Sequence, residues 1–580
     1  MKNSKSMRRI ITLLLITINL SVSANNNRLT NADIGFKTYI KAFNTNEEDN
    51  FGFSIAMYGD LLVVGAPLED SDSKGVNVDG TNNKAQDSGA VYVFSKKSGN
   101  WKQEAFLKAS NTDAGDQFGY SVAIYHNSIV IGAPFEDSNS SNQLDDSKSN
   151  AGAVYVFTQS SGRWGQQSYL KSSYPDTDDN FGYSVGISAD HLVVGMPNDD
   201  STKIYNELNN DEKNVGAALV FEQKANTWIK QAFLKASNLD TGDNFGNSVA
   251  IDNDTIVVGA RYESSKSSKD QKDNTAKNAG AAYVFEINNS SWKQKAYLKA
   301  DNSDAHDEFA HAIAISGDTI VIGAHREDSK SRNINQDSTD NSATDSGAAY
   351  VFEKKSGIWQ QSAFLKTENS DAGDEFGQSV AVFNNNVIVG AMIESGGIPG
   401  ITLMPDVNTK KASGAAYQFA KEQGKWQFIN YHKAINVQEG DWFGYSVALT
   451  KDTIAVSALL EESNAMGING DTKDNWASAS GAVYTYVPYY QVEGKVHGLL
   501  DNNPVTLVNK GYIINTAGMF GFEQIADGTN YAIKIKQQPS NPDKTCYVTG
   551  GNSGQNNGTG KLQGYYDKSI VVICKDRAIK

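Results

Sequence analysis

The sequence contains few of the residues that most often carry catalysis. Its 580 residues include 2 cysteines and 7 histidines. The histidines stand at positions 126, 191, 306, 311, 325, 432 and 497, and none of them belongs to an H-E-x-x-H motif. The chain also has no nucleophile elbow, no phosphate-binding loop and no cysteine in a catalytic setting. The sequence therefore gives no sign of an enzyme, and we expect a non-catalytic protein.

Long apolar stretches are missing beyond the N-terminus. Four lysines and arginines within residues 2–9 precede an apolar run over residues 10–20, which ends in Ser21-Val22-Ser23-Ala24. This order is typical of a secretory signal peptide, and the run is too short to span a bilayer. We predict a signal peptide over residues 1–24 and an exported protein, secreted or at the cell surface, with no membrane span.

Basic residues are scarce relative to acidic ones. The chain has 52 Lys and Arg against 67 Asp and Glu, which gives a formal net charge of −15. Removal of residues 1–24 takes away four positive charges and no negative ones, so the mature charge is −19. Such an acidic chain is repelled by nucleic acids and by anionic membranes, which argues against nucleic-acid binding and against attraction to an anionic membrane. The same charge favours the binding of cations.

What the sequence has in abundance is one repeated pattern. The pattern reads F-G-x-S-V-A-I, I-V-I-G-A-P, a polar loop, G-A-V-Y-V-F and W-x-Q-x-A-F-L-K-A, and successive leading Phe residues are 63 to 67 positions apart. The seven leading Phe residues stand at 51, 118, 181, 245, 309, 376 and 443. A regular period of this length indicates a repeat architecture.

Three of the four connections inside the repeat have fixed lengths. The distances are 14 residues from Phe to the Gly of G-A-P, 12 from the Gly of G-A-x-Y to Trp, and 17 from Trp to the next Phe. Only the segment between G-A-P and G-A-x-Y varies, from 20 to 24 residues. The recurring segments have the alternating or short apolar pattern of β-strands. Seven four-stranded units predict an all-β, seven-bladed β-propeller, in which the variable segment is an exposed loop.

The two ends of the repeat region complement each other. The seventh repeat ends after its third strand, with Glu493 where the spacing requires Trp. At the other end, residues 39–42 match residues 106–109 of the F-L-K-A segment. We therefore predict that the N-terminal segment supplies the outer strand of the last blade and leaves no unpaired edge. The propeller is predicted to span residues 31–488.

This pattern resembles the FG-GAP repeats of the integrin α-chain head, and more closely those of bacterial surface and secreted proteins. The resemblance rests on F-G and G-A-P, which recur seven times in register over residues 34–487. It implies a seven-bladed propeller in an adhesion or ligand-binding setting. In integrins the calcium ligands D-x-D-x-D-G-x-x-D lie between the first two strands. This chain has only a tight turn there, such as Tyr58-Gly59-Asp60, so those calcium sites are not transferred.

The remainder, residues 491–580, is predicted to form a small β-sandwich. Strand-like runs over residues 504–508 and 531–535 are separated by Gly, Asn and Pro. Both cysteines of the chain, Cys546 and Cys574, fall here, and in an exported protein we predict that they form a disulfide. Residues 538–574 also resemble a small domain of bacterial surface proteins that ends in a paired cysteine.

Acidic residues recur at fixed places in two loops that we expect on one face of the ring. An Asp stands two residues before each F-G, and for this Asp we favour a turn role, in which the side chain bonds to its own backbone. In the variable loop an acid follows G-A-P, and a [DN]-x-x-[DN]-[DN] triplet begins ten residues before G-A, although repeats three and six depart from this pattern. Clustered carboxylate and amide oxygens are the ligands that calcium takes, so calcium is the candidate cofactor; turn formation is the alternative. The candidate ligands are Glu69, Asp79, Asn82, Glu136, Asp145, Asp146, Glu263, Asp270, Asp273, Glu327, Asp337, Asp340, Glu461, Asp471 and Asp474.

Three further features have simple interpretations. His306 and His311 flank the fifth Phe, where Ala310 replaces Gly, and we interpret this as a degenerate repeat rather than a metal pair. The recurring Trp keeps strict register with predicted buried strands, so we interpret it as a packing residue rather than a sugar-binding platform. The loop of repeat six, residues 395–404, is apolar and carries no acid–base pair.

The sequence therefore predicts an exported binding or adhesion protein. Its acidic, loop-rich propeller face would be presented to a protein or glycan ligand, with calcium as the candidate cofactor and a monomeric ring as the expected state. The alternative is an extracellular hydrolase or lyase built on a propeller scaffold, because the fold does not decide the function.

Overall fold

The computed structural model describes residues 36–486 apart from 141, 144, 203–211 and 403–407. Of the C-terminal part it describes residues 489–497, 499, 505–509, 512–516, 519–526, 530–539, 544–549, 559–561 and 566–576. The predicted signal peptide, residues 1–24, lies outside the described residues. In the described parts of the chain every regular element is a β-strand, and no helix has the length and apolarity that crossing a membrane takes.

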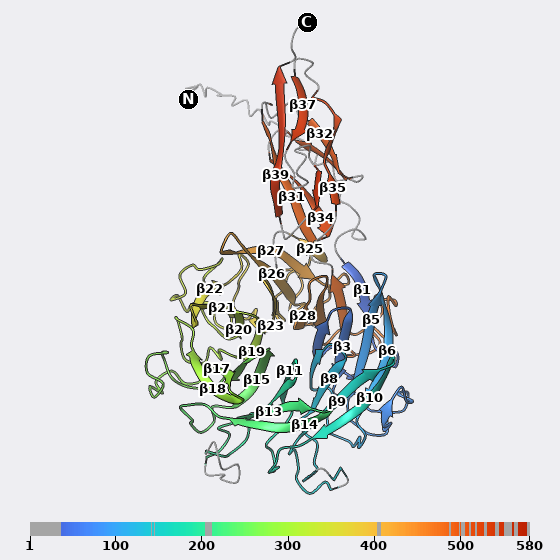
Figure 1. Cartoon of the computed structure of the whole chain (residues 1–580). Helices are drawn as coiled ribbons and strands as arrows, with labels where there is room; N and C mark the ends of the chain where they lie inside the picture. Colours follow the sequence, from blue (N-terminus) through green and yellow to red (C-terminus); the bar gives the residue numbers. More distant parts are fainter. Residues whose placement is uncertain are drawn as a thin grey trace, which may run out of the picture.

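Seven antiparallel sheets form a ring (Figure 1), which confirms the predicted seven-bladed propeller. In each blade the first strand of the repeat lies nearest the axis, where it contacts the first strands of both neighbouring blades. The innermost strands of blades 1 to 7 are β2 (Ser54–Tyr58), β7 (Ser121–Tyr125), β11 (Ser184–Ser188), β15 (Phe245–Asp252), β19 (Ala312–Ser316), β23 (Phe376–Phe383) and β28 (Phe443–Leu449).

The next two strands of each blade follow outward from the axis in chain order. The second strands are β3 (Leu61–Ala66), β8 (Ser128–Ala133), β12 (His191–Met196), β16 (Thr255–Ala260), β20 (Thr319–Ala324), β24 (Asn386–Ala391) and β29 (Ile454–Ala458). The third strands are β5 (Ala90–Lys97), β9 (Ala153–Ser160), β13 (Ala217–Lys224), β17 (Ala281–Asn288), β21 (Ala348–Lys355), β26 (Ala415–Glu422) and β30 (Ala482–Tyr486).

The outermost strands show how the ring closes. Those of blades 1 to 6 are β6 (Asn100–Lys108), β10 (Arg163–Leu170), β14 (Thr227–Leu234), β18 (Ser291–Leu298), β22 (Ile358–Leu365) and β27 (Lys425–Lys433). In blade 7 this place is taken by β1 (Phe36–Ile40) from the other end of the chain, which pairs antiparallel with β30. The predicted closure is therefore confirmed. Two short strands, β4 (Gly75–Val76) and β25 (Gly400–Thr402), extend the outer edges of blades 1 and 6.

The apolar core lies between the blades. In the second and third strands nearly every side chain is buried, because both faces of a blade are covered by its neighbours. This is why these strands read as continuous apolar runs and do not alternate between apolar and polar residues. One apolar cluster, for example, joins Val63 and Val91 of blade 1 to Phe118 and Ile129 of blade 2. The recurring Trp is also buried, with Trp101 6% exposed, which confirms its predicted packing role.

The glycines of F-G and G-A-P meet at the contact between blades. A Cβ atom on Gly65 of blade 1 would lie 2.1 Å from the carbonyl oxygen of Gly119 in blade 2, so only glycine fits there. Gly119 itself has a φ of +95°, which side chains rarely adopt. Ser54 fixes the same contact, because its hydroxyl donates to the Gly119 carbonyl at 2.8 Å. The repeat motif is thus a close backbone contact repeated around the ring.

The described C-terminal strands form two main sheets around one small core, as predicted for a β-sandwich. One sheet has the order β34-β31-β39-β37 and the other β33-β32-β36, with β35 and β38 forming a separate pair. Cys546 and Cys574 lie directly opposite each other on β37 and β39 and form the predicted disulfide inside the core. The strands are β31 (Tyr489–His497), β32 (Val505–Asn509), β33 (Tyr512–Thr516), β34 (Met519–Ala526), β35 (Asn530–Ala532), β36 (Lys534–Gln537), β37 (Lys544–Thr549), β38 (Thr559–Lys561) and β39 (Tyr566–Asp576).

Candidate functional site on the loop face of the ring

The two faces of the ring carry different connections. The long loops between the second and third strands, and those that lead from one blade into the next, emerge on one face, which we call the loop face. The tight turns emerge on the opposite face, the turn face. There the ends of the seven innermost strands line a cavity of about 570 Å³ in the central channel, bordered by residues such as Tyr58, Tyr125 and Phe383. All the predicted metal ligands belong to the loop face.

The acid that follows G-A-P forms a buried ion pair with the lysine that ends the F-L-K motif. In blade 1, Glu69 Oε2 lies 2.7 Å from Lys108 Nζ, and both side chains are at most 1% exposed. The other six pairs are Glu136–Lys171, Asp199–Lys235, Glu263–Lys299, Glu327–Lys366, Glu394–Lys433 and Glu461–Lys41. An ammonium group thus lies beside each of these acids, five of which are among the predicted calcium ligands. The last pair also attaches the closing strand β1 to blade 7.

Hydrogen bonds from neighbouring strands complete this buried network. Asn44 Nδ2 donates to Glu69 Oε1 at 3.1 Å, and the Tyr92 hydroxyl donates to Asn44 Oδ1 at 2.7 Å. The Ser71 hydroxyl donates to Glu69 Oε2 at 2.9 Å. Because Asn44 lies in the loop that enters blade 1 from blade 7, the network joins two blades. The same asparagine contact recurs at Asn111, Asn238, Asn302, Asn369 and Asn436.

In blade 3, three residues of this buried network differ from those at the same positions in the other blades. Asp199 replaces the glutamate, Tyr174 stands where the other repeats have asparagine, and Leu219 replaces the tyrosine. Tyr174 is 50% exposed and does not enter the network. Without the asparagine, a tyrosine at position 219 would bury a hydroxyl with no acceptor, which is unfavourable. The loss of the asparagine therefore explains why blade 3 also lacks the tyrosine, and all three changes fall in one network.

The Asp that stands two residues before each repeat Phe is buried and shapes the loop. Asp116 Oδ2 accepts the backbone N–H of Asp113 at 3.1 Å, and the same contact recurs in all seven blades. The predicted turn role is thereby confirmed. Burial, and then the neighbouring carboxylate of Glu136, raise the pKa of Asp116 to about 8. Burial likewise raises the pKa to about 8 at Asp49, Asp179, Asp243 and Asp307, and to about 7 at Asp374 and Asp441.

These raised pKa values predict that the ring loses stability as the pH rises from about 5 to 8. Between the unfolded pKa near 4 and the folded pKa near 7 to 8, the folded state binds more protons than the unfolded state, so the free energy of unfolding falls with pH. Each fully shifted carboxyl contributes about 1.4 kcal/mol per pH unit. Denaturant unfolding at pH 5, 6.5 and 8 and constant ionic strength measures this slope.

Asp116→Asn is the matched variant for this slope. Asparagine keeps the oxygen that accepts the Asp113 N–H but does not titrate, so the variant should unfold with a slope shallower by up to about 1.4 kcal/mol per pH unit. A free energy of unfolding that rises between pH 5 and 8 would contradict the prediction.

The predicted ligands of the variable loop are half-buried or exposed, and most of them accept a hydrogen bond from the backbone two residues ahead. Asp79 Oδ1 accepts the Thr81 N–H at 2.9 Å, and Asp337 Oδ1 accepts the Thr339 N–H at 3.0 Å. The same kind of contact is made by four more of these ligands, Asp270, Asp273, Asp340 and Asp471. Two others, Asp474 and Asn82, accept backbone N–H groups from across the loop. The backbone N–H of Asp145 donates to the carbonyl oxygen of Asn142. Side chains of this type in such contacts form Asx-turns. No three of the predicted acids gather around one point in the described residues.

The third residue of the loop triplet contacts the loop that enters the blade. Asn341 Nδ2, for example, donates to Asp304 Oδ2 at 2.9 Å, and Asn274 donates to Asp240 in the same way. In blade 2 both positions are acidic, with Asp146 beside Asp113. Partial burial, and then the charge of Asp113, raise the pKa of Asp146. At this place in blade 2 the two loops therefore bring like charges near each other, where other repeats have an amide.

Comparison with known protein families matches the FG-GAP repeat to seven segments of the chain, residues 37–94, 101–157, 164–221, 228–285, 292–352, 359–419 and 433–486. The chain belongs to the FG-GAP repeat family. Among curated proteins, none matches the chain. Each of the first six FG-GAP units begins with the outer strand of one blade and ends with the third strand of the next. This offset of one strand is the reason why the first unit supplies β1 to the last blade.

The FG-GAP motif also places one side chain of each blade at the mouth of the central channel on the loop face. These side chains follow F-G in each repeat and are Phe53, Tyr120, Tyr183, Asn247, His311, Gln378 and Tyr445. The aromatic rings pack against one another, with centroids 4.8 Å apart for Phe53 and Tyr120 and 5.0 Å apart for Tyr120 and Tyr183. The channel mouth is therefore aromatic over blades 7, 1, 2 and 3 and polar over blades 4, 5 and 6.

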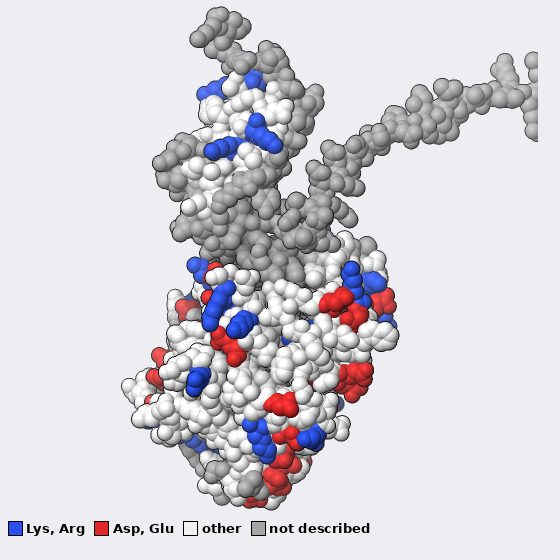
Figure 2. Space-filling model, turned by 90° about the vertical axis from the view of Figure 1, so that its right-hand side faces the viewer, with Lys and Arg blue, Asp and Glu red and all other residues white. Residues whose placement is uncertain are grey.

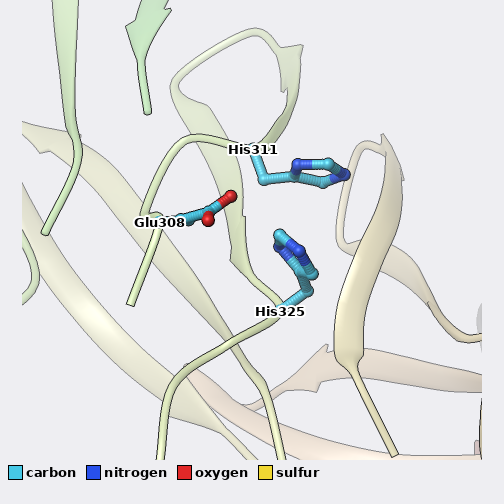
Figure 3. A group of neighbouring side chains, drawn as sticks. All are labelled: Glu308, His311 and His325. Atoms are coloured by element: carbon cyan, nitrogen blue, oxygen red, sulfur yellow. The ribbon is translucent and has the colours of Figure 1, made fainter. Parts of the chain in front are cut away.

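Three side chains of blade 5 converge in the polar half of the channel mouth (Figure 3). His311 precedes β19 and His325 follows β20, and these strands pair with Ala312 opposite Gly323, which brings the two histidines together. Their ring centroids are 4.0 Å apart, and the Glu308 carboxylate points toward them. His311 thus meets His325, and His306 is not part of this group. Proximity in the sequence suggested His306 and His311; the strand register identifies the histidine that was missed.

Large exposed apolar side chains gather in the variable loops of blades 6 and 7. Trp476 is 77% exposed and Met466 61% exposed, and both lie in the loop of blade 7. Ile398, 41% exposed, lies in the apolar loop of blade 6. On the side of the ring shown in Figure 2, acidic side chains stand in separate groups with lysine and arginine between them. The variable loops of blades 6 and 7 thus expose large apolar side chains.

Proposed function

We propose that this FG-GAP protein is an exported, non-enzymatic binding protein whose loop face takes a protein or glycan ligand. The observation that carries the proposal is Trp476, which is 77% exposed on a variable loop while the recurring Trp residues are buried in the blades. Aromatic side chains of this kind dominate binding energies at interfaces. A disulfide in the C-terminal domain fits an oxidising, extracellular setting. We expect the ring to act as a monomer.

The test is binding of the full-length protein to glycan and protein arrays. Trp476→Ala should weaken the strongest signal by about thirtyfold, which corresponds to about 2 kcal/mol. Ile358→Ala is the matched control, because Ile358 is 61% exposed but begins β22 at the turn face. Equal binding by the wild type and Trp476→Ala would contradict the assignment of the ligand to this loop.

Calcium remains part of the proposal at one loop. The acids beside the buried lysines already have a cationic partner, whereas the pKa of Asp146 in blade 2 is raised by the negative charge of Asp113 after burial. A calcium ion would relieve this repulsion, and at 100 times its dissociation constant it would stabilise the folded ring by about 2.7 kcal/mol. The melting temperature should therefore rise in millimolar calcium and fall with a chelator.

Asp146→Asn is the control for calcium. It installs the amide that other repeats have at this position, so it should reduce the calcium shift and raise the melting temperature in chelator. If the wild-type melting temperature is the same with calcium and with chelator, turn formation is the only role of these acids.

An extracellular hydrolase or lyase remains the second candidate, because one observation favours it. Glu308, His311 and His325 form a group that does not recur in the other blades, and a catalytic propeller is expected to break its repeat with such clustered polar residues. Loss of a hydrolytic or lyase activity in His325→Pro, with binding to the arrays retained, would support this candidate.

A further inference from the structure

We propose that Glu308, His311 and His325 bind a transition-metal ion, with Zn²⁺ the expected metal, at the channel mouth of the loop face. This inference concerns a site that the binding function does not need, and it stands or falls independently of the ligand of the loop face. It rests on the placement of the three side chains, on the histidine nitrogens that have no hydrogen-bond partner, and on the kind of metal that such donor atoms bind.

Blade 5 departs from the repeat at both histidine positions, whereas the glutamate at position 308 has a counterpart in blade 6, Glu375. Where it has His311, the other blades have Phe, Tyr, Asn or Gln, and where it has His325, three of the other blades have the Pro of G-A-P. Glu308 occupies the position before the repeat Phe. Between them, Ala310 replaces the glycine of F-G and adopts a φ of +73°, which is unfavourable for alanine. Strained backbone that persists beside a cluster of polar side chains is typical of functional sites.

The geometry places three donor atoms around one point. One atom each from Glu308, His311 and His325 lies within 4.8 Å of the other two, and this is the only group of its kind among His, Cys, Asp and Glu in the described part of the chain. Tetrahedral zinc with bonds of about 2.0–2.1 Å holds its ligands about 3.3 Å apart. The donor atoms therefore have to approach one another by side-chain rotation to bind the ion, and the Glu308 carboxylate already points toward the two rings (Figure 3).

Both histidines carry a buried nitrogen that no protein group satisfies. The Nδ1 atoms of His311 and His325 have no hydrogen-bond partner, and His325 is only 6% exposed. An unsatisfied buried polar atom costs about 1–3 kcal/mol, and such atoms are rare in folded proteins. Imidazole nitrogens are common metal ligands, so an ion at this point would give both of these atoms a partner.

The donor set selects the class of metal. Two imidazole nitrogens and one carboxylate oxygen suit Zn²⁺ and other late first-row ions, whereas calcium and magnesium prefer oxygen ligands alone. Arg326 Nη1 contacts Glu308 Oε1 at 3.3 Å, so the ion pair engages one oxygen of the carboxylate and orients it. Three protein ligands leave the fourth position of a tetrahedral zinc site for water or a ligand atom.

Titration of the untagged, metal-free, full-length protein with Zn²⁺ in a calorimeter, and with Co²⁺ by visible absorption, tests the site. We expect one ion per chain, with the intense d–d bands of tetrahedral cobalt. The double variant His311→Tyr/His325→Pro, which carries the residues that blade 2 has at these positions (Tyr120 and Pro134), should bind at least 100-fold more weakly. The single variant Glu308→Asn, with the residue of Asn244 in blade 4, should also weaken binding.

His306→Asn is the matched control, because His306 is an exposed histidine of the same loop outside the group. It should bind zinc as the wild type does. Zinc binding of unchanged affinity in both the double variant and Glu308→Asn would overturn the proposal, as would wild-type protein that binds no zinc at millimolar concentration. Glu308→Asn keeps the test decisive if the double variant does not fold.

Discussion

Deletion of residues 30–42 should leave the ring unable to close, and the truncated protein should aggregate or fail to fold. The deletion removes β1, which is the outer strand of blade 7, and exposes the edge of β30 over its whole length. An unpaired edge of this kind is a template for association with other chains. The expected effect is larger than for any single substitution, because the ring loses a strand and a buried ion pair together.

The energies support a complete loss of the fold. Tyr39 and Ile40 are at most 1% exposed, and the burial of two such side chains contributes about 1.5–3 kcal/mol each. Removal of Lys41 leaves the buried Glu461 without its cation, which costs about 3–5 kcal/mol. Together these losses are comparable to the whole stability of a typical folded protein, about 5–15 kcal/mol.

Circular dichroism melting and size-exclusion chromatography measure the outcome. Deletion of residues 1–29, which keeps β1, is the control and should melt like the full protein. Lys41→Met in the full chain removes the ion pair with Glu461 but keeps the strand β1. This variant should destabilise the ring but leave it monomeric. A truncation of residues 30–42 that melts as the full protein does would show that β1 is not needed for closure.

The architecture could be predicted from the sequence because the repeat occurs seven times in the chain. Fixed spacings located the four strands of each blade, although not the short edge strands β4 and β25. The missing Trp strand of the last repeat, together with residues 39–42, identified the closure. The roles of the glycines were not predicted, since they concern a contact between two blades. Only the structure shows that a Cβ on Gly65 would meet the backbone of Gly119.

The buried network was missed although both of its partners were visible. The acid after G-A-P and the lysine of F-L-K recur in every repeat, but in the first six blades they stand 35 to 39 residues apart, and we interpreted the acid as a calcium ligand. The topology resolves this. The second strand ends and the outer strand ends on the same face of the blade, which places Glu69 beside Lys108. A lysine that recurs as strictly as an acid is the signal that could have identified the pair.

The histidine group was missed for a different reason. Proximity in the sequence drew attention to His306 and His311, whereas His325 stands at the proline position of G-A-P, 14 residues further along. Pairing of the first strand with the second, as of β19 with β20, brings these two positions together, but only blade 5 has histidine at both. A comparison of the repeats position by position, followed by the strand register, would have found the pair.

The second large effect concerns a single buried lysine, in blade 5. Lys366 is 1% exposed, and its ammonium group donates to Glu327 Oε2 at 3.2 Å, to the Ser346 hydroxyl at 2.7 Å and to the Gly347 carbonyl at 2.7 Å. All three of its hydrogens are thus engaged. Lys366→Met should lower the free energy of unfolding by about 3–5 kcal/mol, because it leaves the buried carboxylate of Glu327 without a cation.

The double variant Glu327→Gln/Lys366→Met should recover most of this loss. Glutamine removes the buried charge but keeps an oxygen that can accept from Asn302, so the remaining cost is that of altered hydrogen bonds. Arg332→Met is the control for a surface pair, since Arg332 and Asp371 are 53% and 44% exposed, and it should cost at most about 1 kcal/mol. Denaturant unfolding of the three variants gives these energies. A double variant as unstable as Lys366→Met would mean that the lysine acts through packing of its long side chain, and that the repeated ion pair does not stabilise the ring through charge.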